Sequence, residues 1–399
     1  MASLVMSLKK LYRTVCTEQD FFGPFDLLLI LPGFHLARGW HGLRVRLVFG
    51  AMRAIQLFSY LIWADRFVLA LLNASANPGK ALHYSNTFGV LSMMVARMLV
   101  FKWYVVDVER LQQYIRRQRA ATPPATGSYR KIVKTAIIFQ LIGLADRAVF
   151  VFSSTYRREL YEMPANVSRY GWMAELLVHI FSFDFAWRWA AAYNTSLTGM
   201  NSIMLGLSDE LAEIAEDYRH LLVVEPGIDF WTQLERNIRR TVRRHEQFLQ
   251  QLDLLKPFLR TTFLLMFYSA VIFLAIGMFM ISANERPSTY DIILSGFLVT
   301  LLLECYWCCQ LVDRLNDEND RIGEQLYGLE WPEQLCYSLP NAHRYRQARS
   351  SLLIMMSMTQ KSLGITCGGM FEMSSEAFAS LVKLTYTMLM FLRDTQHPN

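Results

Sequence analysis

Long apolar blocks separated by polar, arginine-rich segments are the feature that most constrains this chain. Hydrophobic residues make up 53% of its 399 residues, charged residues only 19%, and the mean hydropathy is +0.20. A helix that crosses a bilayer needs roughly 20 mostly apolar residues. The sequence therefore predicts an all-α, polytopic membrane protein with seven transmembrane helices. The predicted spans are residues 43–63 (extending as far as 72), 82–106, 132–152, 172–192, 261–281, 292–312 and 377–392.

The polar segment between spans four and five keeps a helical period, because Leu211, Ile214, Ala215 and Tyr218 share one helix face. This spacing predicts that both spans extend as helices into the cytoplasm. An apolar block at 350–358 is too short to cross a membrane and is expected to form a short docking helix. The predicted regions are a cytoplasmic N-terminal segment (1–42), spans one to four with external loops (43–206), a cytoplasmic helical layer (207–260), spans five and six (261–312), a cytoplasmic segment with the docking helix (313–376), and the last span with a short tail (377–399).

Lysine and arginine are unevenly divided between the connecting segments. The segment that leads into span one and the second, fourth and sixth loops each carry at least six, whereas the other three loops carry two, three and one. An excess of Lys and Arg marks the cytoplasmic side. The N-terminus is therefore expected in the cytoplasm and, with seven spans, the C-terminus outside. No cleavable signal is apparent, so the first span is expected to start insertion.

Three Asn-x-Ser/Thr sequons bear on this orientation, since only external sites receive sugar. Asn73 and Asn166 fall in loops that the charge bias places outside, and both are predicted glycosylation sites. Asn194 falls near the inner end of span four and is expected to stay unmodified.

Motifs for enzyme chemistry are missing from the sequence. It has no G-x-S-x-G, Walker or dinucleotide-binding glycine pattern and no His pair with metal-ligand spacing. Cys305, Cys308 and Cys309 have no second ligand pair, which favours buried apolar cysteines over a zinc site. We therefore expect no enzyme, no cofactor and no metal.

Ionisable residues inside predicted spans are costly and are candidates for function. Most are expected to form pairs between helices, because the acids do not line up across several spans as a proton relay would require. Asp184 and Arg188, four residues apart, are placed to pair along one helix face. The other candidates are Arg53, Arg97, Lys102, Asp146, Arg147, Glu304 and Lys383.

The last quarter of the chain carries an ordered set of motifs. A polar stretch at 311–320 leads to Tyr327, and Trp331 follows four residues later. Segments 349–361, 365–374, 378–386 and 388–393 then follow in order. In order and spacing, this region resembles the insect odorant receptor family.

Two departures leave a related family open. Ser362 stands where a proline usually follows the Gln-Lys/Arg pair, and Thr385-Tyr386 replaces the common Ser-Tyr. Thr-Tyr is similar to the gustatory receptors, but those continue to a Gln-Phe where this chain has Leu392-Arg393. A gustatory receptor channel is therefore the alternative within the superfamily.

The resemblance implies an odorant-tuning subunit that assembles with a co-receptor subunit into a tetrameric, odorant-gated, non-selective cation channel at the plasma membrane of sensory dendrites. It implies a pore lined by the last helix, with Leu389 at the apolar constriction; Thr385, Leu389 and Leu392 share one helix stripe. It places the odorant pocket in the outer half of the bundle. The expected odorant-binding residues are Tyr84, Phe88, Val149, Phe150, His179, Phe183, Tyr290 and Ile293.

Two other classes were weighed. A G-protein-coupled receptor is suggested by Asp146-Arg147, but this pair lies within its span, the charge bias is reversed and no N-P-x-x-Y occurs. A carrier is the third possibility. The expected partners are thus the co-receptor, a small volatile ligand and membrane lipid, with no nucleic acid.

Overall fold

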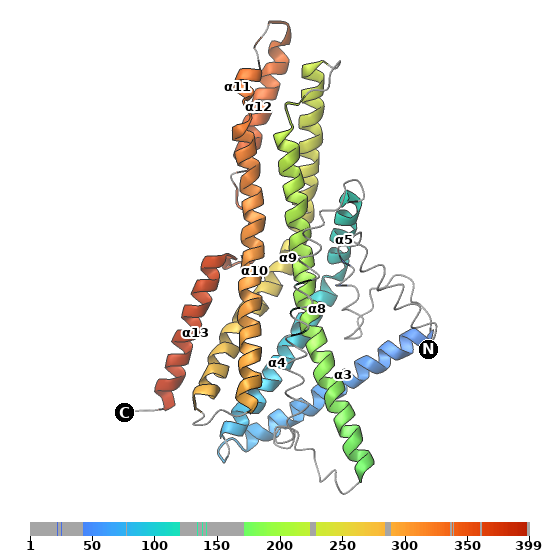
Figure 1. Ribbon diagram of the computed structural model, residues 1–399, viewed down its shortest axis with the longest axis vertical. Helices are drawn as coiled ribbons and strands as arrows, with labels where there is room; N and C mark the ends of the chain where they lie inside the picture. The colour runs from blue at the N-terminus through green and yellow to red at the C-terminus, as the bar shows by residue number, and fades with distance from the viewer. Residues whose placement is uncertain are drawn as a thin grey trace.

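The computed structural model of the protein consists mainly of long helices (Figure 1). It describes residues 43–76, 78–119, 171–223, 229–283, 289–335, 337, 339–359 and 361–396, with isolated positions 22, 25, 134, 138 and 141. Within these ranges only the backbone is described at 43–46, 119, 174–192, 289–290 and 395–396. The elements are α3 (Leu43–Leu72), α4 (Pro78–Trp103), α5 (Val105–Arg119), α8 (Trp172–Arg219), α9 (Phe230–Ala283), α10 (Thr289–Gly328), α11 (Trp331–Gln334), the 3-10 turn η2 (Leu339–Asn341), α12 (Ala342–Thr359), strands β1 (Thr366–Cys367) and β2 (Phe371–Glu372), and α13 (Ser375–Gln396).

Three described helices, α3, α9 and α10, are long and apolar enough to cross a membrane. A fourth crossing results if α4 and α5, which meet at a 63° bend, form one span. The second span was predicted as one helix over residues 82–106. Its end is wrong, because α4 ends at Trp103 and a separate helix, α5, begins at Val105. The predicted fourth and seventh spans lie on α8 and α13, and the third lies outside the described residues. Seven crossings remain a prediction.

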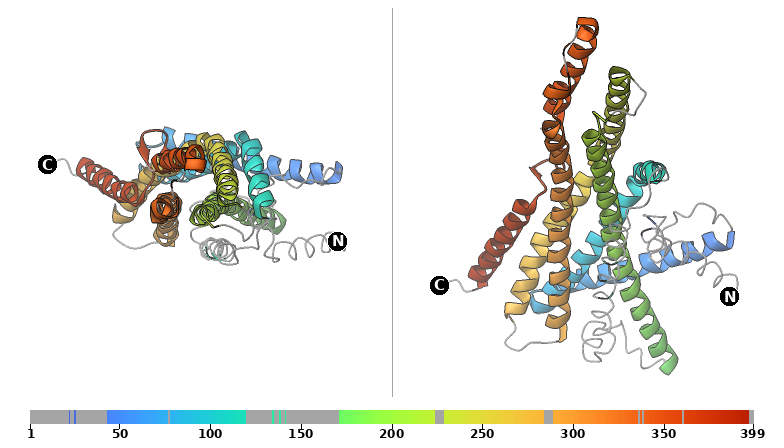
Figure 2. Two further views of the ribbon diagram at one scale, coloured as in Figure 1. Left: turned by 90° about the horizontal axis from the view of Figure 1, so that it is seen from above. Right: turned by 45° about the horizontal axis from the view of Figure 1, so that its top comes forward.

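Helices α8, α9 and α10 run on from their apolar parts into one polar bundle, which α12 joins (Figures 1 and 2). We call this bundle, residues 207–260 with 313–359, the stalk. The helical stripe predicted in this segment is confirmed, because Leu211, Ile214, Ala215 and Tyr218 are all almost completely buried. These side chains form the centre of the main hydrophobic core, in contact with α9 and α10.

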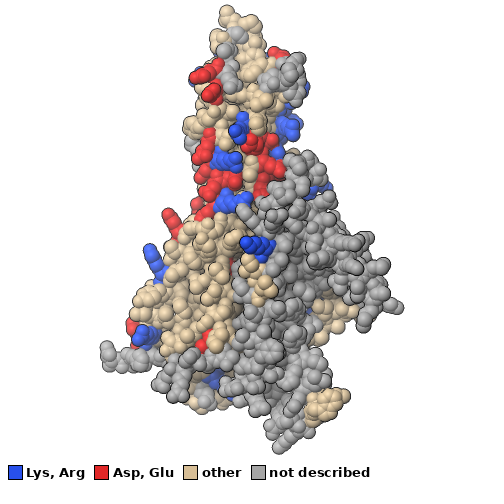
Figure 3. All heavy atoms as spheres, in the orientation of Figure 1, with Lys and Arg blue, Asp and Glu red and all other residues tan. Residues whose placement is uncertain are grey.

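Charged side chains gather on the stalk, in the upper part of Figure 3, where acidic and basic residues alternate. Below it, the visible face of the helices is mostly uncharged (Figure 3). Large apolar side chains are exposed on these helices, including Leu57 and Phe58 on α3 and Ile272 on α9. Exposed apolar surface of this extent on several helices is typical of contact with lipid.

Arg244 is the most extensively paired charge in the stalk. Its Nε donates to Glu210 (3.0 Å), Nη2 to Glu213 (2.7 Å) and Nη1 to Asp217 (2.9 Å). These three carboxylates lie on one face of α8, so a single guanidinium holds α9 against α8. Burial raises the pKa of Glu210, although hydrogen bonding to Arg244 acts in the opposite direction.

A two-stranded hairpin was not expected from the all-α prediction. Strands β1 and β2 pair antiparallel, and Met370 N donates to Cys367 O (3.0 Å) across the turn. Gly368 and Gly369 have φ of 60° and 82°, which is the backbone that a tight hairpin turn requires and that glycine adopts without strain. Gly368 N also donates to Arg260 O (3.2 Å), so the turn is attached to α9.

The predicted docking helix exists but begins earlier. The block at 350–358 forms only the second half of α12, which starts at Ala342. The first half has little apolar content, but its Ala348 is buried on the same face as Leu352 of the second half. At its end, Asn319 Nδ2 of α10 donates to the carbonyls of Thr359 and Lys361 (both 3.3 Å) and so holds α12 in place.

Candidate functional site

An aromatic cluster lies where α3 and α4 meet α8, α9 and α10. Phe67 stacks on Phe88 with ring centroids 4.8 Å apart, and Tyr60 contacts the same ring at 5.3 Å. Trp63 and Tyr84 are buried with centroids 5.9 Å apart. Ring contacts of this kind give a large apolar surface with a few polar atoms, which suits an aromatic or aliphatic ligand.

Three of the expected odorant-binding residues fall in this cluster. Tyr84 is a core member with 3% of its surface exposed, and Phe88 and Ile293 are half-buried against it. Although Tyr84 and Ile293 are far apart in sequence, the fold brings them into one group.

The structure does not describe the side chains of the other expected odorant-binding residues, and odorant binding stays a prediction for all eight. Val149 and Phe150 lie outside the described residues. His179 and Phe183 lie on α8 and Tyr290 on the first turn of α10, but none of these three side chains is described.

A small cavity of about 250 Å³ opens beside the cluster, with Tyr84 in its wall. Arg66, Lys80 and Asn73 line the same cavity and give it a polar side. Asn73 is exposed, and its Nδ2 donates to Leu69 O (3.0 Å) at the end of α3. Asn194, by contrast, is buried within α8. Asn166 lies outside the described residues.

One turn of helix from the cluster lies a buried charged group formed by Arg97 of α4, Tyr193 of α8 and Glu304 of α10. Arg97 Nη1 donates to Glu304 Oε1 (2.5 Å), and Tyr193 OH donates to Glu304 Oε2 (2.5 Å). The Arg97 guanidinium also lies over the Tyr193 ring, 5.2 Å from its centroid. We call these three residues the charged triad.

The triad is removed from water, since the Arg97 and Glu304 side chains are only 2% and 3% exposed. A buried ion pair gains Coulomb energy but loses the hydration of both ions, so its net contribution is small unless every polar atom is satisfied. Here it is not: Arg97 Nε and Nη2 have no hydrogen-bond partner among the described residues. The triad therefore joins three helices at a high cost in desolvation.

The prediction that intramembrane charges pair between helices is confirmed for Arg97 and Glu304. The prediction for Asp146, Arg147, Asp184 and Arg188 falls on residues or side chains outside the described part of the chain. Cys305, Cys308 and Cys309 are buried beside the triad and carry no disulfide, as expected for apolar cysteines.

The last helix, α13, packs on α9 and α10. The face that carries the expected pore residues points toward the subunit itself: Thr385 is 3% exposed, and Leu389 and Leu392 are half-buried. Tyr386 and Phe391, which flank this stripe on its two sides, are 60% and 67% exposed. In the isolated subunit, one of the three expected pore residues is therefore buried and the other two are partly accessible.

The start of α13 is fixed to α10. Asp313 Oδ2 accepts hydrogen bonds from Ser375 N (2.9 Å) and Ser375 Oγ (2.5 Å), and Gln310 Nε2 donates to Ser375 Oγ (2.7 Å). A carboxylate on the first amides of a helix satisfies donors that the helix itself leaves open. Three hydrogen bonds therefore attach the N-terminus of α13 to α10.

Sequence reasoning missed Tyr60, Trp63 and Phe67. Their spacing was a usable signal, because aromatic residues at i, i+3 and i+7 form one helix face. Tyr193 was missed because it directly follows the predicted fourth span. Nothing in the sequence identified Glu304 as the partner of Arg97, 207 residues away.

The arrangement as a whole is that of a multi-pass helical membrane protein: long apolar helices around an aromatic cluster, with a charged stalk. Comparison with known families and structures agrees with this class. The profile described as 7tm Odorant receptor matches residues 77–386. This chain belongs to the seven-transmembrane odorant receptor family, as predicted from its last quarter, and that family consists of receptors rather than enzymes.

Solved structures have the same fold. The olfactory receptor OR5 from the insect Machilis hrabei matches with a TM-score of 0.68 and 12% sequence identity, over 97% of this chain and 98% of that chain. The structure of the same receptor in complex with eugenol matches with the same score and identity, over 93% and 97%. At this identity the likeness shows the fold alone. Comparison with curated proteins gives no match.

Proposed function

We propose that this chain is an odorant-tuning subunit that, together with a co-receptor subunit, forms an odorant-gated, non-selective cation channel in the plasma membrane. The observation that carries the proposal is the aromatic cluster: residues expected to bind odorant, Tyr84, Phe88 and Ile293, pack as one group in a chain of the odorant receptor family. The OR5 receptor that shares this fold has been solved with eugenol, a small aromatic molecule.

The proposed topology has seven spans with the N-terminus in the cytoplasm, which makes the stalk cytoplasmic. The Lys and Arg bias of the loops and the exposed position of Asn73 support it. Glycan mapping of the expressed protein is the test: sugar at Asn73 and Asn166, with none at Asn194, is expected. Sugar at Asn194 alone would overturn the orientation.

Channel function is tested by recording from cells that express this chain with the co-receptor while G-protein signalling is blocked. We expect odorant-evoked cation current to persist under the block. Loss of all response would favour a G-protein-coupled receptor, and uptake of substrate without current would favour a carrier. Testing volatile compounds and tastants on the same cells distinguishes an odorant receptor from a gustatory receptor.

We propose that the pore is lined by α13 through Leu389 and Leu392, with Thr385 on the same stripe. An apolar ring closes a pore by excluding water, so Leu389→Ser is expected to raise the basal current. Thr385 is buried in the isolated subunit, and it reaches the pore only if α13 turns or moves away from α9. Phe391→Ser, on the side of α13 turned away from Leu389, is the control, and equal effects of the Leu389 and Phe391 substitutions would reject the assignment.

The odorant pocket is tested at its best-placed residue. Phe88→Ala removes a ring that contacts both Tyr60 and Phe67, and it is expected to shift the odorant concentration for half-maximal current by about tenfold or more. Surface labelling confirms that the variant reaches the membrane. An unchanged dose response for every active odorant would remove the cluster from the binding site.

A further inference from the structure

A large hollow lies on the stalk between α9, α8 and the end of α5, with a volume of about 780 Å³. Its lining is dominated by arginine: Arg236, Arg239, Arg240, Arg243 and Arg244, all from three turns of α9. Glu235 and Asp217 are the two carboxylates in the lining, and the lining contains no aromatic side chain. The hollow is separate from the aromatic cluster and from α13.

Two of the five arginines are neutralised within the subunit. Arg244 is bonded to three carboxylates of α8, Asp217 among them, and Arg239 pairs with Glu235 (2.8 Å). Both carboxylates of the lining are therefore occupied. Arg236, Arg240 and Arg243 are exposed and make no ion pair with any described residue. Three guanidinium charges thus remain available at the hollow.

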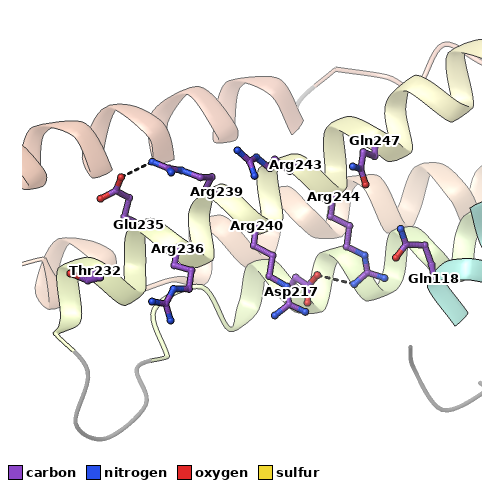
Figure 4. A pocket seen from close by; sticks show the side chains of 10 residues that line it. All are labelled: Gln118, Asp217, Thr232, Glu235, Arg236, Arg239, Arg240, Arg243, Arg244 and Gln247. Atoms are coloured by element: carbon purple, nitrogen blue, oxygen red, sulfur yellow. Dashed lines mark hydrogen bonds and ion pairs between the residues drawn. The ribbon is translucent and has the colours of Figure 1, made fainter. Parts of the chain in front are cut away.

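The free charges are arranged along the helix rather than scattered. Arg236 and Arg240 are one helical turn apart, about 6 Å along the axis, and Figure 4 shows both pointing to the same side of α9 as Arg244. Arg243 lies on the other side of the helix (Figure 4). Guanidinium groups bind phosphate oxygens with two parallel hydrogen bonds, and a row of them fits several phosphates on one compact molecule.

The distance of the hollow from the apolar part of α9 indicates which phosphate compounds can reach it. Arg240 is 21 residues from the start of the apolar part of α9 at position 261, which corresponds to about 30 Å of helix. A lipid headgroup at the membrane surface does not reach that far. The lack of an aromatic surface also disfavours a nucleotide, whose base would be stacked on one.

We propose that this hollow binds a soluble polyphosphate, of the inositol polyphosphate class, through Arg236 and Arg240 with Arg243 at its edge. Its location in the cytosol rests on the proposed topology, but binding to the hollow does not. Occupation would place negative charge between α8 and α9, in the part of the stalk that Arg244 already joins.

The test is equilibrium binding of inositol hexakisphosphate to the purified full-length chain in detergent, followed by calorimetry. The pocket variant is Arg236→Gln with Arg240→Gln. The matched control is Arg346→Gln with Arg349→Gln, which removes the same charge from exposed positions on α12 outside the hollow. Thermal unfolding of all three proteins shows whether each is folded. We expect the pocket variant to bind at least ~10-fold more weakly, the control to bind as the wild type does, and raised salt to weaken wild-type binding.

Several results would overturn the proposal: no binding by the wild type, equal affinity of the pocket variant, or an equal loss in both variants, which would indicate non-specific attraction. A lysine pair, Arg236→Lys with Arg240→Lys, keeps the charge without the forked geometry and is expected to bind with intermediate affinity. Binding to phosphoinositide vesicles without binding of the soluble compound would assign the hollow to lipid instead. The assay needs neither odorant nor current, so failure of the channel proposal leaves it intact.

Discussion

Two arginines, one half-buried and one buried, hold the two halves of the molecule together in different ways. In the stalk, Arg244 is 18% exposed and all three of its guanidinium nitrogens are bonded to carboxylates. In the apolar half, Arg97 is 2% exposed, has one carboxylate partner, and has two nitrogens without a partner among the described residues. Arg244 thus has three carboxylate partners for one positive charge and lies close to water. Arg97 is shielded from water and leaves two of its hydrogen-bond donors unused.

The difference indicates different roles. A pair with complete hydrogen bonding near the surface stabilises one arrangement, here α8 against α9. A dry pair with unused donors is stabilised by a single partner, so a small shift of one helix changes its energy steeply. Tyr193 belongs to both the triad and the aromatic cluster, and Glu304 lies on the same helix as Asp313, which caps α13, so the triad is part of a continuous set of contacts from the cluster to the last helix.

The largest effect is expected from breaking the triad. Glu304→Ala leaves Arg97 buried without its carboxylate, and the free energy of unfolding is expected to fall by about 3–5 kcal/mol. Denaturant unfolding of the purified protein in mixed micelles measures it. Arg97→Met with Glu304→Leu removes both charges and is the control, since it is expected to recover most of the stability. If Glu304→Ala alone is as stable as the wild type, the pair does not hold the helices.

Tyr193→Phe is a finer change at the same site. It removes the hydrogen bond to Glu304 Oε2 but keeps the ring beneath Arg97. A hydrogen bond to a charged group contributes roughly 1.5–3 kcal/mol, so a loss within that range is expected in the same unfolding measurement. We also expect a shift in the odorant dose response, because the ring lies between the cluster and the ion pair. A loss of stability with no change in gating would make the triad purely structural.

The corresponding change in the stalk is expected to be smaller and to depend on salt. Arg244→Met leaves Glu210, Glu213 and Asp217 close together, but water reaches the site, and a loss of about 1–2 kcal/mol is expected. Repulsion among the three carboxylates is screened by salt, so raised ionic strength should recover part of this loss. The Glu304→Ala defect should not respond to salt. If raised salt recovers the same fraction of stability in Arg244→Met and Glu304→Ala, the two sites do not differ in their exposure to water.

The sequence predicted the parts of this fold that depend on local patterns. Apolar length located the helices of spans one, two, five and six, and periodicity located the buried face that contains Leu211 and Tyr218. The bend at Tyr104 has no proline or glycine signal, and the hairpin at Gly368-Gly369 has strands of only two residues. Both are settled by packing against other elements, as the bond from Gly368 N to Arg260 O illustrates.

The candidate site was harder to predict than the fold. Tyr84, Phe88 and Ile293 were expected at the pocket because of a family resemblance. Their cluster also depends on Tyr60, Trp63 and Phe67, whose spacing indicates one face of α3 but not which helix that face contacts. The Arg97–Glu304 pair was expected only as a kind of contact, since the sequence does not encode which of several acids an arginine will meet. Long-range pairing is a property of helix packing, and helix packing is set by the whole set of apolar faces together.

The smallest expected effect is a pH dependence of stability that arises in the stalk. In the stalk, His245 is buried, its Nδ1 lies 3.0 Å from Tyr218 OH, and burial lowers its pKa from the ordinary value of 6.5. Below pH 6.5 the unfolded chain binds a proton at this position that the folded chain does not, so stability should fall as the pH is lowered through that value. His245→Gln should abolish this part of the pH dependence, as measured by thermal unfolding. A wild-type stability that is flat between pH 7 and the lowered pKa would show that His245 is protonated in the folded stalk and that water reaches this part of its interior.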